Sequence, residues 1–181
     1  MKSIFQQSDY ENGDGMLTKI WGPALWHSLH VLSFNYPVKP TKLQKKQYRN
    51  FILNLQYVLP CRHCRENLQK SFKKDLPLKI SSMENRYTFS LYIYNLHEHV
   101  NKILNKCSGL SYSDVRDRYE HFRSRCNKTK SCNQPLVGKK SKCVLRIIPE
   151  HVKTKTLKIN KECECQKQKK RFLHPKSRKV T

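Results

Sequence analysis

Two cysteines separated by two residues, Cys61 and Cys64, are the side chains of this sequence that are best placed to carry chemistry. A Cys-x-x-Cys pair is typical of a redox disulfide or of half a structural zinc site, and it also occurs among inert thiols. A zinc site needs a second ligand pair at a characteristic spacing, whereas the next cysteine is Cys107 and no second Cys-x-x-Cys exists. The spacing therefore favours redox chemistry, with zinc binding and inert thiols as the alternatives.

Positive charge lies beside the cysteine pair in Arg62, His63 and Arg65. Because Pro60 ends the apolar segment before the pair, we expect a helix to begin at the cysteines. The positive end of a helix dipole and nearby cations both stabilise a thiolate, which is the species that attacks disulfides and flavins. The alternative is that these cations form an ordinary solvated surface. Two cysteines alone exchange disulfides without creating new ones, so net oxidation also needs an electron acceptor.

The elements that must position this pair are five segments whose apolar residues recur at helical spacing. The segment from Tyr87 to Lys106 has the clearest stripe, and Ser111 or Ser113 is a candidate N-cap for the segment after it. Nothing within residues 20–125 alternates as a β-strand does. We therefore predict an all-α fold, a four-helix bundle with a short fifth helix. The predicted helices span about residues 21–35, 43–59, 61–74, 87–106 and 111–125.

Three regions of different composition divide the chain. Residues 1–18 are polar and contain the turn-forming Asn12-Gly13-Asp14-Gly15, so we expect a flexible leader. Residues 19–126 hold the apolar stripes and form the predicted helical domain. Residues 127–181 contain 17 Lys or Arg against 3 acidic residues, with little periodic apolar content. This last region is expected to be a basic, cysteine-containing and largely irregular C-terminal extension that is mostly disordered.

The charge balance is strongly basic, with 37 Lys and Arg against 13 Asp and Glu and a formal net charge of +24. Such a balance predicts non-specific contact with polyanions through the basic extension, for example through residues 167–171. No segment approaches the roughly 18 apolar residues of a membrane span, and residues 1–16 lack the apolar run of a secretory signal. We therefore expect a cytoplasmic protein. Eight cysteines are many for that reducing compartment, which again indicates redox chemistry or metal binding.

Three short motifs follow one another along the predicted helical domain: W-G-P-A-L-W-H-S-L-H at residues 21–30, L-P-C-R-H-C at 59–64 and H-E-H-V-N-K-I-L-N-K at 97–106. In this order they resemble the W-G-x-x-x-W-x-x-L-H, redox-centre and H-N-x-V-N-x-x-L-x-K motifs of the Erv/ALR family of FAD-linked sulfhydryl oxidases. The resemblance covers about residues 20–125 and is greatest to the family members from large cytoplasmic DNA viruses.

The resemblance implies an FAD-dependent thiol oxidase in which a helical bundle holds the flavin between its helices. The five glycines and the lack of a G-x-G-x-x-G motif argue against a Rossmann-type site. The enzyme would oxidise a protein dithiol substrate or a thiol relay protein and pass the electrons to O2, giving H2O2. Cys64 is implied to lie against the isoalloxazine, as the charge-transfer thiolate and transient adduct, and Cys61 to exchange with incoming dithiols. A homodimer is also implied, and a viral origin would place the protein in the host cytoplasm and in the virion.

The resemblance also assigns a set of side chains to FAD. Trp26 and His30 are one helical turn apart and are implied to contact the flavin, whereas His97 and Asn101 would hold its adenine end. Two lysines are candidates for the pyrophosphate and one tyrosine for a position beside the adenine, and no metal ligand is implied. The ordinary alternatives are core packing for Trp26 and the histidines, and solvated surface for the lysines. The predicted cofactor-binding residues are Trp26, His30, His97, Asn101, Lys102, Lys106 and Tyr119.

The chain departs from the family pattern in two places. Glu98 stands where an asparagine usually follows the motif histidine. Because a carboxylate beside a pyrophosphate is unfavourable, we expect Glu98 to turn away or to pair with a cation. Tyr112 stands where cellular members carry a structural cysteine, so the disulfide of that cysteine is not expected. A Cys107–Cys126 bond is the expected replacement.

Cys163 and Cys165 form a Cys-x-Cys pair in the basic extension. By resemblance to family members that have a mobile second dithiol, they are a candidate shuttle that relays electrons from the substrate to the core pair. The alternatives are a metal-binding cluster with Cys126, Cys132 and Cys143, whose spacing matches no common zinc pattern, or no role at all. For the whole chain, the rival functions are a basic binding module with a zinc-stabilised core and a structural protein that has lost its flavin.

Overall fold

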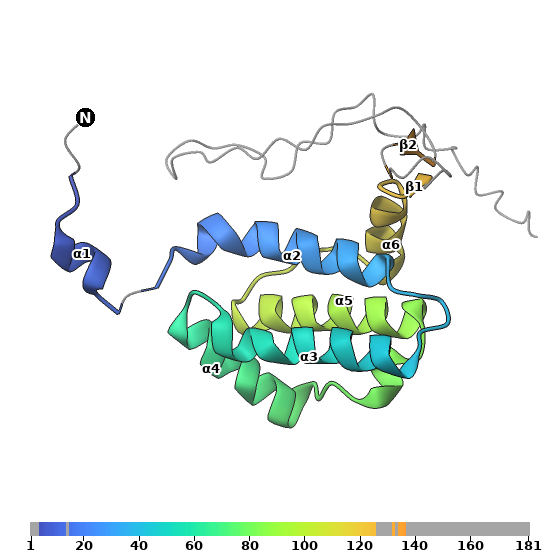
Figure 1. The fold of residues 1–181 in the computed structure, drawn as a ribbon, viewed down its shortest axis with the longest axis horizontal. Helices are drawn as coiled ribbons and strands as arrows, with labels where there is room; N and C mark the ends of the chain where they lie inside the picture. Colours follow the sequence, from blue (N-terminus) through green and yellow to red (C-terminus); the bar gives the residue numbers. More distant parts are fainter. Residues whose placement is uncertain (1–3, 14, 126–131, 133, 137–181) are drawn as a thin grey trace, which may run out of the picture. The chain divides into compact units, whose positions relative to one another are not determined.

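The domain that carries the motifs is built of α-helices (Figure 1). The computed structural model describes residues 4–13, 15–125, 132 and 134–136. The chain divides into two units, residues 1–122 and 123–181, and every described helix belongs to the first. The predicted all-α class is therefore confirmed. The helices are α1 (Gln7–Glu11), α2 (Thr18–Phe34), α3 (Lys42–Val58), α4 (Arg62–Lys70), α5 (Arg86–Ile103) and α6 (Tyr112–Glu120).

Four of these helices form the bundle. α2 packs against α5 and α3 packs against α4, while the short α6 contacts α2 and α5 (Figure 1). The core contains Phe89, Ile93 and Leu96, which lie on one stripe of α5 and are at most 1% exposed. The fully buried Tyr36 donates its hydroxyl hydrogen to the carbonyl of Met83 at 2.9 Å, so the core contains no unsatisfied phenol there. This core holds α5, which carries the third motif, against the other helices.

Capping side chains determine where three of the helices begin. Thr41, Asn85 and Ser111 each accept a hydrogen bond from the backbone N–H three residues later, which satisfies a donor at the helix start. A reciprocal capping box completes each of these caps. Of the two candidate caps of the last helix, Ser111 is therefore the one that acts.

The last helix is shorter than predicted. α6 ends at Glu120 rather than at residue 125. In the second unit, Ser124–Arg125 forms β1, which pairs antiparallel with β2 (Gln134–Pro135). The sequence pattern does not predict this pair, because two residues are too few for a recognisable alternating stripe.

The helix that carries the third motif also ends before its predicted end. α5 stops at Ile103, and Asn105 adopts a left-handed backbone conformation with φ of 53°. The N–H of Lys106 then donates to the carbonyl of Asn101 at 2.8 Å, which is the closing bond of a Schellman motif. The prediction that the helix includes Lys106 is wrong, and this residue lies beyond the last turn.

Several short elements lie outside the predicted set. α4 continues into a π-helical turn, η1 (Ser71–Asp75), in which the N–H of Leu76 donates to the carbonyl of Ser71 at 2.8 Å. A 3-10 helix, η2 (Ile80–Met83), follows before α5, and α1 lies within the predicted leader. Among the described residues, no helix combines the length and the apolar character that crossing a membrane requires.

Candidate active site

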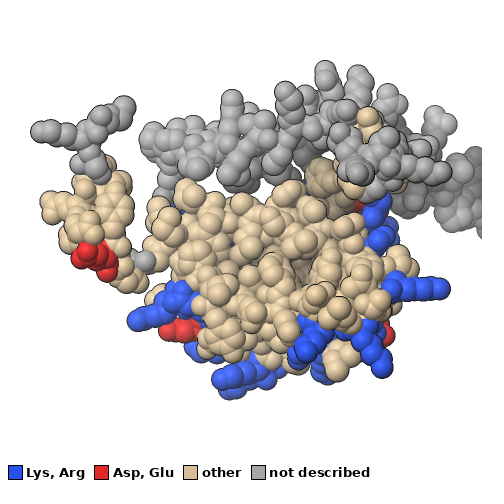
Figure 2. Space-filling view, viewed as in Figure 1, with Lys and Arg blue, Asp and Glu red and all other residues tan. Residues whose placement is uncertain are grey.

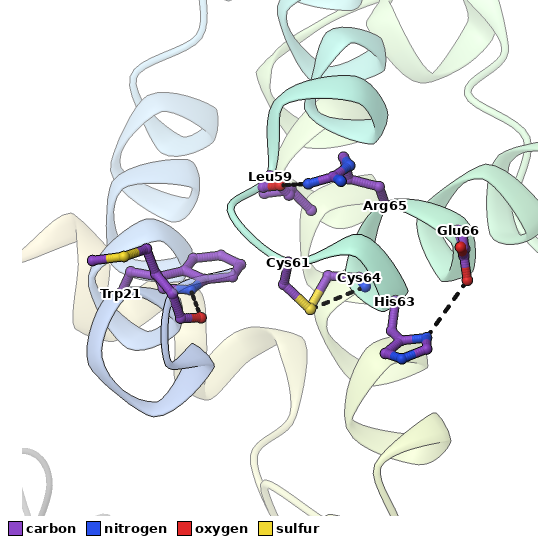
Figure 3. The surroundings of a disulfide bond; sticks show 8 residues. Trp21, Leu59, Cys61, His63, Cys64, Arg65 and Glu66 are labelled. Carbon is purple, nitrogen blue, oxygen red and sulfur yellow. Dashed lines mark hydrogen bonds and ion pairs between the residues drawn. A yellow bond between two sulfur atoms is a disulfide. The ribbon is translucent and has the colours of Figure 1, made fainter. Parts of the chain in front are cut away.

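Cys61 and Cys64 form a disulfide at the start of α4 (Figure 3). Their Cα atoms are 5.2 Å apart, and both residues are half-buried. Cys61 is the N-cap residue of α4, and its Sγ accepts a hydrogen bond from the N–H of Cys64 at 3.2 Å. The predicted helix start at the pair is therefore confirmed. A disulfide leaves neither sulfur free as a zinc ligand, and the described part of the chain contains no group of three metal-ligating side chains.

The three cations beside the pair have different partners. The Nε of Arg62 and the Nδ1 of His63 each lie 3.5 Å from a carboxylate oxygen of Glu66. Arg65 is half-buried, and its guanidinium donates to the carbonyl of Leu59 (Figure 3). Exposed ion pairs contribute little to the local potential. The N-terminal end of α4 and the half-buried guanidinium of Arg65 both add positive potential near the sulfur of the N-cap residue.

Four of the predicted FAD-binding side chains meet where α2, α5 and α6 pack together, and we refer to them as the ring cluster. The indole of Trp26 and the imidazole of His97 are stacked, with ring centroids 4.1 Å apart. The Nε2 of His30 lies 3.0 Å from the Nδ1 of His97, so one imidazole donates to the other. Tyr119 stacks on His30 with ring centroids 5.1 Å apart. The first motif, the third motif and the last helix thus contribute to one site.

His30 is the most deeply buried member of the ring cluster, with 3% of its surface exposed. Burial, and then the neighbouring His97 and His27, lower the pKa of His30 to about 3. Burial also lowers the pKa of His97, against a smaller opposing effect of Glu98. Both imidazoles of the cluster are therefore neutral near pH 7. The Nδ1 of His30 is buried and has no hydrogen-bond partner among the described residues, which is the kind of atom that a bound group satisfies.

Tyr119 links the ring cluster to two further aromatic residues of α2. Its ring lies nearly parallel to that of Phe34, at 9° and with centroids 5.5 Å apart, and its hydroxyl lies 3.3 Å from the Nδ1 of His27. Burial raises the pKa of Tyr119 to about 12, so the phenol keeps its proton. Neither His27 nor Phe34 was predicted from the sequence. Their spacing of three and four residues from His30, on one helical face, is the signal that identifies them.

A cavity of about 90 Å³ opens beside the ring cluster. Glu98 lines it and accepts a hydrogen bond from the side-chain amide of Asn101 at 3.0 Å. The structure pairs Glu98 with this amide, and its direction relative to a pyrophosphate stays a prediction. Arg118 also lines the cavity, and no motif pointed to this residue. Lys102 and Lys106 are exposed, and neither belongs to the lining of the cavity.

The remaining cysteines are placed in part. Cys107 is a free and exposed thiol, so the expected Cys107–Cys126 bond is wrong. Cys132 is disulfide-bonded, which removes it as a thiolate ligand from the alternative metal cluster. Cys126 and the candidate shuttle pair, Cys163 and Cys165, lie outside the described residues.

Known proteins with similar sequences share the part of the chain that contains this site. The chain is 32% identical over 100 residues to the FAD-linked sulfhydryl oxidase of an African swine fever virus isolate, and the match covers 55% of this chain and 80% of the viral protein. It is 34% identical over 85 residues to the FAD-linked sulfhydryl oxidase ERV1 of Arabidopsis thaliana, covering 47% of this chain and 42% of the plant protein.

The fold and the family profile agree with these relatives. The crystal structure of the FAD-binding domain of Erv1 from Saccharomyces cerevisiae matches with a TM-score of 0.51 and 25% identity, over 57% of this chain and 94% of that chain. The sequence model of the Erv1/Alr family matches residues 23–120, which is more than half of the chain. These residues include the cysteine pair and every member of the ring cluster. As its three motifs predicted, the protein belongs to the Erv1/Alr family.

Proposed function

We propose that this protein is an FAD-linked thiol oxidase that makes disulfides in protein dithiols through Cys61 and Cys64. The observation that carries the proposal is the disulfide between these residues at the start of α4, in a chain of the Erv1/Alr family. The similarity to FAD-linked sulfhydryl oxidases from a virus and a plant supports both the cofactor and the reaction class.

The ring cluster supports FAD as the cofactor. Aromatic and imidazole faces are suited to stacking on flat ring systems, and the unpaired Nδ1 of His30 offers a buried polar contact. Arg118 lines the adjacent cavity and supplies a guanidinium suited to phosphate. The cavity, at about 90 Å³, is smaller than a dinucleotide and would hold only part of the cofactor. Asn101, Lys102 and Lys106 remain predicted FAD contacts.

The cysteine pair carries out the exchange with substrate. A substrate thiolate attacks the Sγ of Cys61, forms a mixed disulfide with it and breaks the bond to Cys64, which leaves as a thiolate. The second substrate thiolate attacks the substrate sulfur of the mixed disulfide, so that the substrate disulfide forms and Cys61 becomes a thiolate. The N–H of Cys64 and the end of α4 stabilise the negative charge on Cys61. The substrate has then lost two electrons and two protons, and the pair has gained the electrons.

When bound beside the ring cluster, FAD would supply the oxidising power, as the acceptor of these two electrons before O2, with H2O2 as the product. His30 and His97 provide hydrogen bonding at this site without carrying charge, since burial keeps both neutral. The phenol of Tyr119 keeps its proton and is a donor at neutral pH.

A homodimer is proposed through the outer face of α2. This helix contains a single charged residue, Lys19, and its Val31 and Leu32 are exposed. Figure 2 shows the Lys and Arg side chains of one face gathered over the other helices, with almost none over α2. An uncharged helix face with exposed apolar side chains is suited to self-association. Sedimentation that shows only monomer at micromolar concentration would contradict this part. Polyanion contact through the basic extension and a cytoplasmic location stay predictions.

The test of the function uses the purified full-length chain. We expect a yellow protein that consumes O2 in the presence of dithiothreitol and releases H2O2. Cys64→Ser should lose turnover and keep its colour, because non-covalent contacts hold FAD. Cys107→Ser is the matched control, since that thiol is free and exposed, and it should keep both properties. A colourless chain that binds zinc would support the basic binding module, and a colourless, metal-free folded chain would support the structural role.

A further inference from the structure

Residues 15–17, which we call the leader strap, run past the connection between α3 and α4. We call this connection, residues 59–61, the cysteine turn, and Cys61 in it is the outer cysteine, which the substrate attacks. The N–H of Met16 donates to the carbonyl of Pro60 at 2.8 Å. The carbonyl of Met16 accepts a hydrogen bond from the indole N–H of Trp21 at 3.1 Å, and Figure 3 shows this indole on the side of the disulfide that faces α2. The backbone N–H and the backbone carbonyl of Met16 are therefore both hydrogen-bonded, the N–H to the cysteine turn and the carbonyl to α2.

Gly15 approaches the cysteine turn so closely that no side chain fits there. A Cβ atom at this position would lie 2.5 Å from the carbonyl oxygen of Pro60 and 3.3 Å from the Cα of Cys61. Both are backbone atoms, so neither can rotate away as the end of a flexible side chain can. Gly13 provides a contrast two residues earlier, because a Cβ atom there meets nothing within 4 Å.

The cysteine turn is therefore held from three directions. The N–H of Met16 donates to the carbonyl of Pro60. Arg65 donates to the carbonyl of Leu59, and the N–H of Cys64 in the first turn of α4 donates to the sulfur of Cys61 (Figure 3). Two of these contacts are local in the sequence, and the strap is the one that comes from outside the α3–α4 connection. Its loss would leave this turn with the two hydrogen bonds from within its own segment, Arg65 to Leu59 and Cys64 to Cys61.

We propose that Gly15 and Met16 are positioning residues for Cys61, which keep its sulfur at the N-terminus of α4 while a substrate thiolate attacks it. The inference rests on the proposed thiol exchange. In that step a bond forms between the substrate sulfur and Cys61, the bond to Cys64 breaks, and Cys64 leaves with the electron pair. A displaced turn would misalign the attacked sulfur and would also remove the helix end that stabilises Cys61 as a thiolate.

The experiment compares Gly15→Ala with Gly13→Ala in the full-length chain. Each oxidised protein is exposed to excess dithiothreitol for timed intervals in the absence of O2, so that the pair is not re-oxidised, and thiol alkylation at Cys61 and Cys64 is followed by peptide-resolved mass spectrometry. We expect Gly15→Ala to open the disulfide at least about tenfold more slowly, because small displacements of reacting groups carry costs of this size or more. Gly13→Ala should match the parent chain.

A second readout separates positioning from general damage to the fold. In the reduced proteins, alkylation of Cys61 as a function of pH should shift to higher pH in Gly15→Ala and not in Gly13→Ala, since the thiolate of Gly15→Ala loses the helix end. Trp21→Phe keeps an aromatic ring but removes the indole N–H that donates to the carbonyl of Met16. It should therefore shift the alkylation profile of Cys61 to higher pH as well. This variant replaces Gly15→Ala if Gly15→Ala fails to fold.

The outcomes are distinguishable from those of the proposed function, because alkylation needs neither flavin nor O2. Faster opening in Gly15→Ala would overturn the inference and identify the strap as a cover over the disulfide. Unchanged opening and an unchanged pH profile would overturn it as well. A colourless chain with the expected alkylation pattern would contradict the oxidase and leave the positioning role standing.

Discussion

The indole ring of Trp26 lies face to face with the imidazole ring of His97, with 4.1 Å between centroids and 7° between planes. The first residue belongs to the first sequence motif, on α2, and the second to the third motif, on α5. The same imidazole shares a hydrogen bond with His30 at 3.0 Å. His97 of α5 therefore contacts both Trp26 and His30 of α2. Loss of its side chain should weaken cofactor binding.

We expect His97→Ala to lose most of its bound flavin, because the variant removes the ring stack and the hydrogen bond together. A loss of about 1.4 kcal/mol in binding lowers affinity tenfold. The ratio of visible flavin absorbance to protein absorbance after gel filtration measures the effect. His99→Ala is the control on the same helix, since its Nε2 lies 2.9 Å from the hydroxyl of Ser71 and it contacts no member of the ring cluster by hydrogen bond. Equal flavin content in both variants would contradict the assignment.

The protein should lose stability in mild acid because of His30. Its pKa is about 3 in the folded state and 6.5 as the reference for the unfolded state, so only the unfolded chain takes up this proton between these values. The free energy of unfolding should therefore fall as the pH decreases from about 6.5 towards 3. Urea denaturation across this range measures it. His30→Asn cannot titrate and should give a flatter profile, and an identical slope in both proteins would refute the explanation.

Asn85→Ala should destabilise the protein by about 1 kcal/mol, because it removes the cap of α5. The side chain of Asn85 accepts from the N–H of Thr88 at 3.0 Å, and an alanine cannot replace that bond. Thermal or urea unfolding measures the change. Asn95→Ala is the matched control, as the same substitution at an exposed position within the same helix should cost little. A similar cost at both positions would mean that the cap contributes nothing specific.

The candidate shuttle gives a prediction for residues that the structure does not describe. We expect a Cys163→Ser/Cys165→Ser double variant to oxidise a reduced protein substrate more slowly and to keep its rate with dithiothreitol. The reason is that a small dithiol reaches Cys61 directly, whereas a protein dithiol needs a relay. O2 consumption with the two substrates separates the cases. Equal loss with both substrates, or no loss with either, would rule the relay out.

Residues that repeat along one helix face are predictable from the sequence. The family resemblance assigned Trp26 to the flavin and His97 to the adenine end of FAD, and the structure stacks these two rings on each other. The stripe of Phe89, Ile93 and Leu96, by contrast, identifies α5 from spacing. Spacing alone reveals such residues because the helix fixes which side chains share a face.

Features that depend on contacts between distant backbone segments are not predictable in this way. The hydrogen bond from Met16 to Pro60 joins two main-chain groups, so no side-chain pattern predicts it. The one related sequence feature is Gly15, and its turn-forming neighbours suggest a flexible leader instead. Helix ends escape prediction for a different reason, since the left-handed conformation of Asn105 directly follows the last apolar residues of the stripe and is not visible in the side-chain pattern. The hydrogen bond between Glu98 and Asn101 was not predicted, because Asn101 had been assigned to the cofactor.

The π-helical turn η1 fixes the number of residues that connect α4 to Leu76. One residue corresponds to about 100° of rotation in a helix. This turn contains one more residue than a regular α-helical turn. Directly after it, the carbonyl of Leu76 accepts a hydrogen bond from the hydroxyl of Tyr92 at 2.9 Å. Deletion of a single residue here would rewind the turn and rotate α4, with its buried Leu68, relative to Leu76. This rotation would also displace the disulfide at the start of α4. Gaps in relatives of this chain should therefore fall outside Ser71–Asp75, whatever residues occupy it.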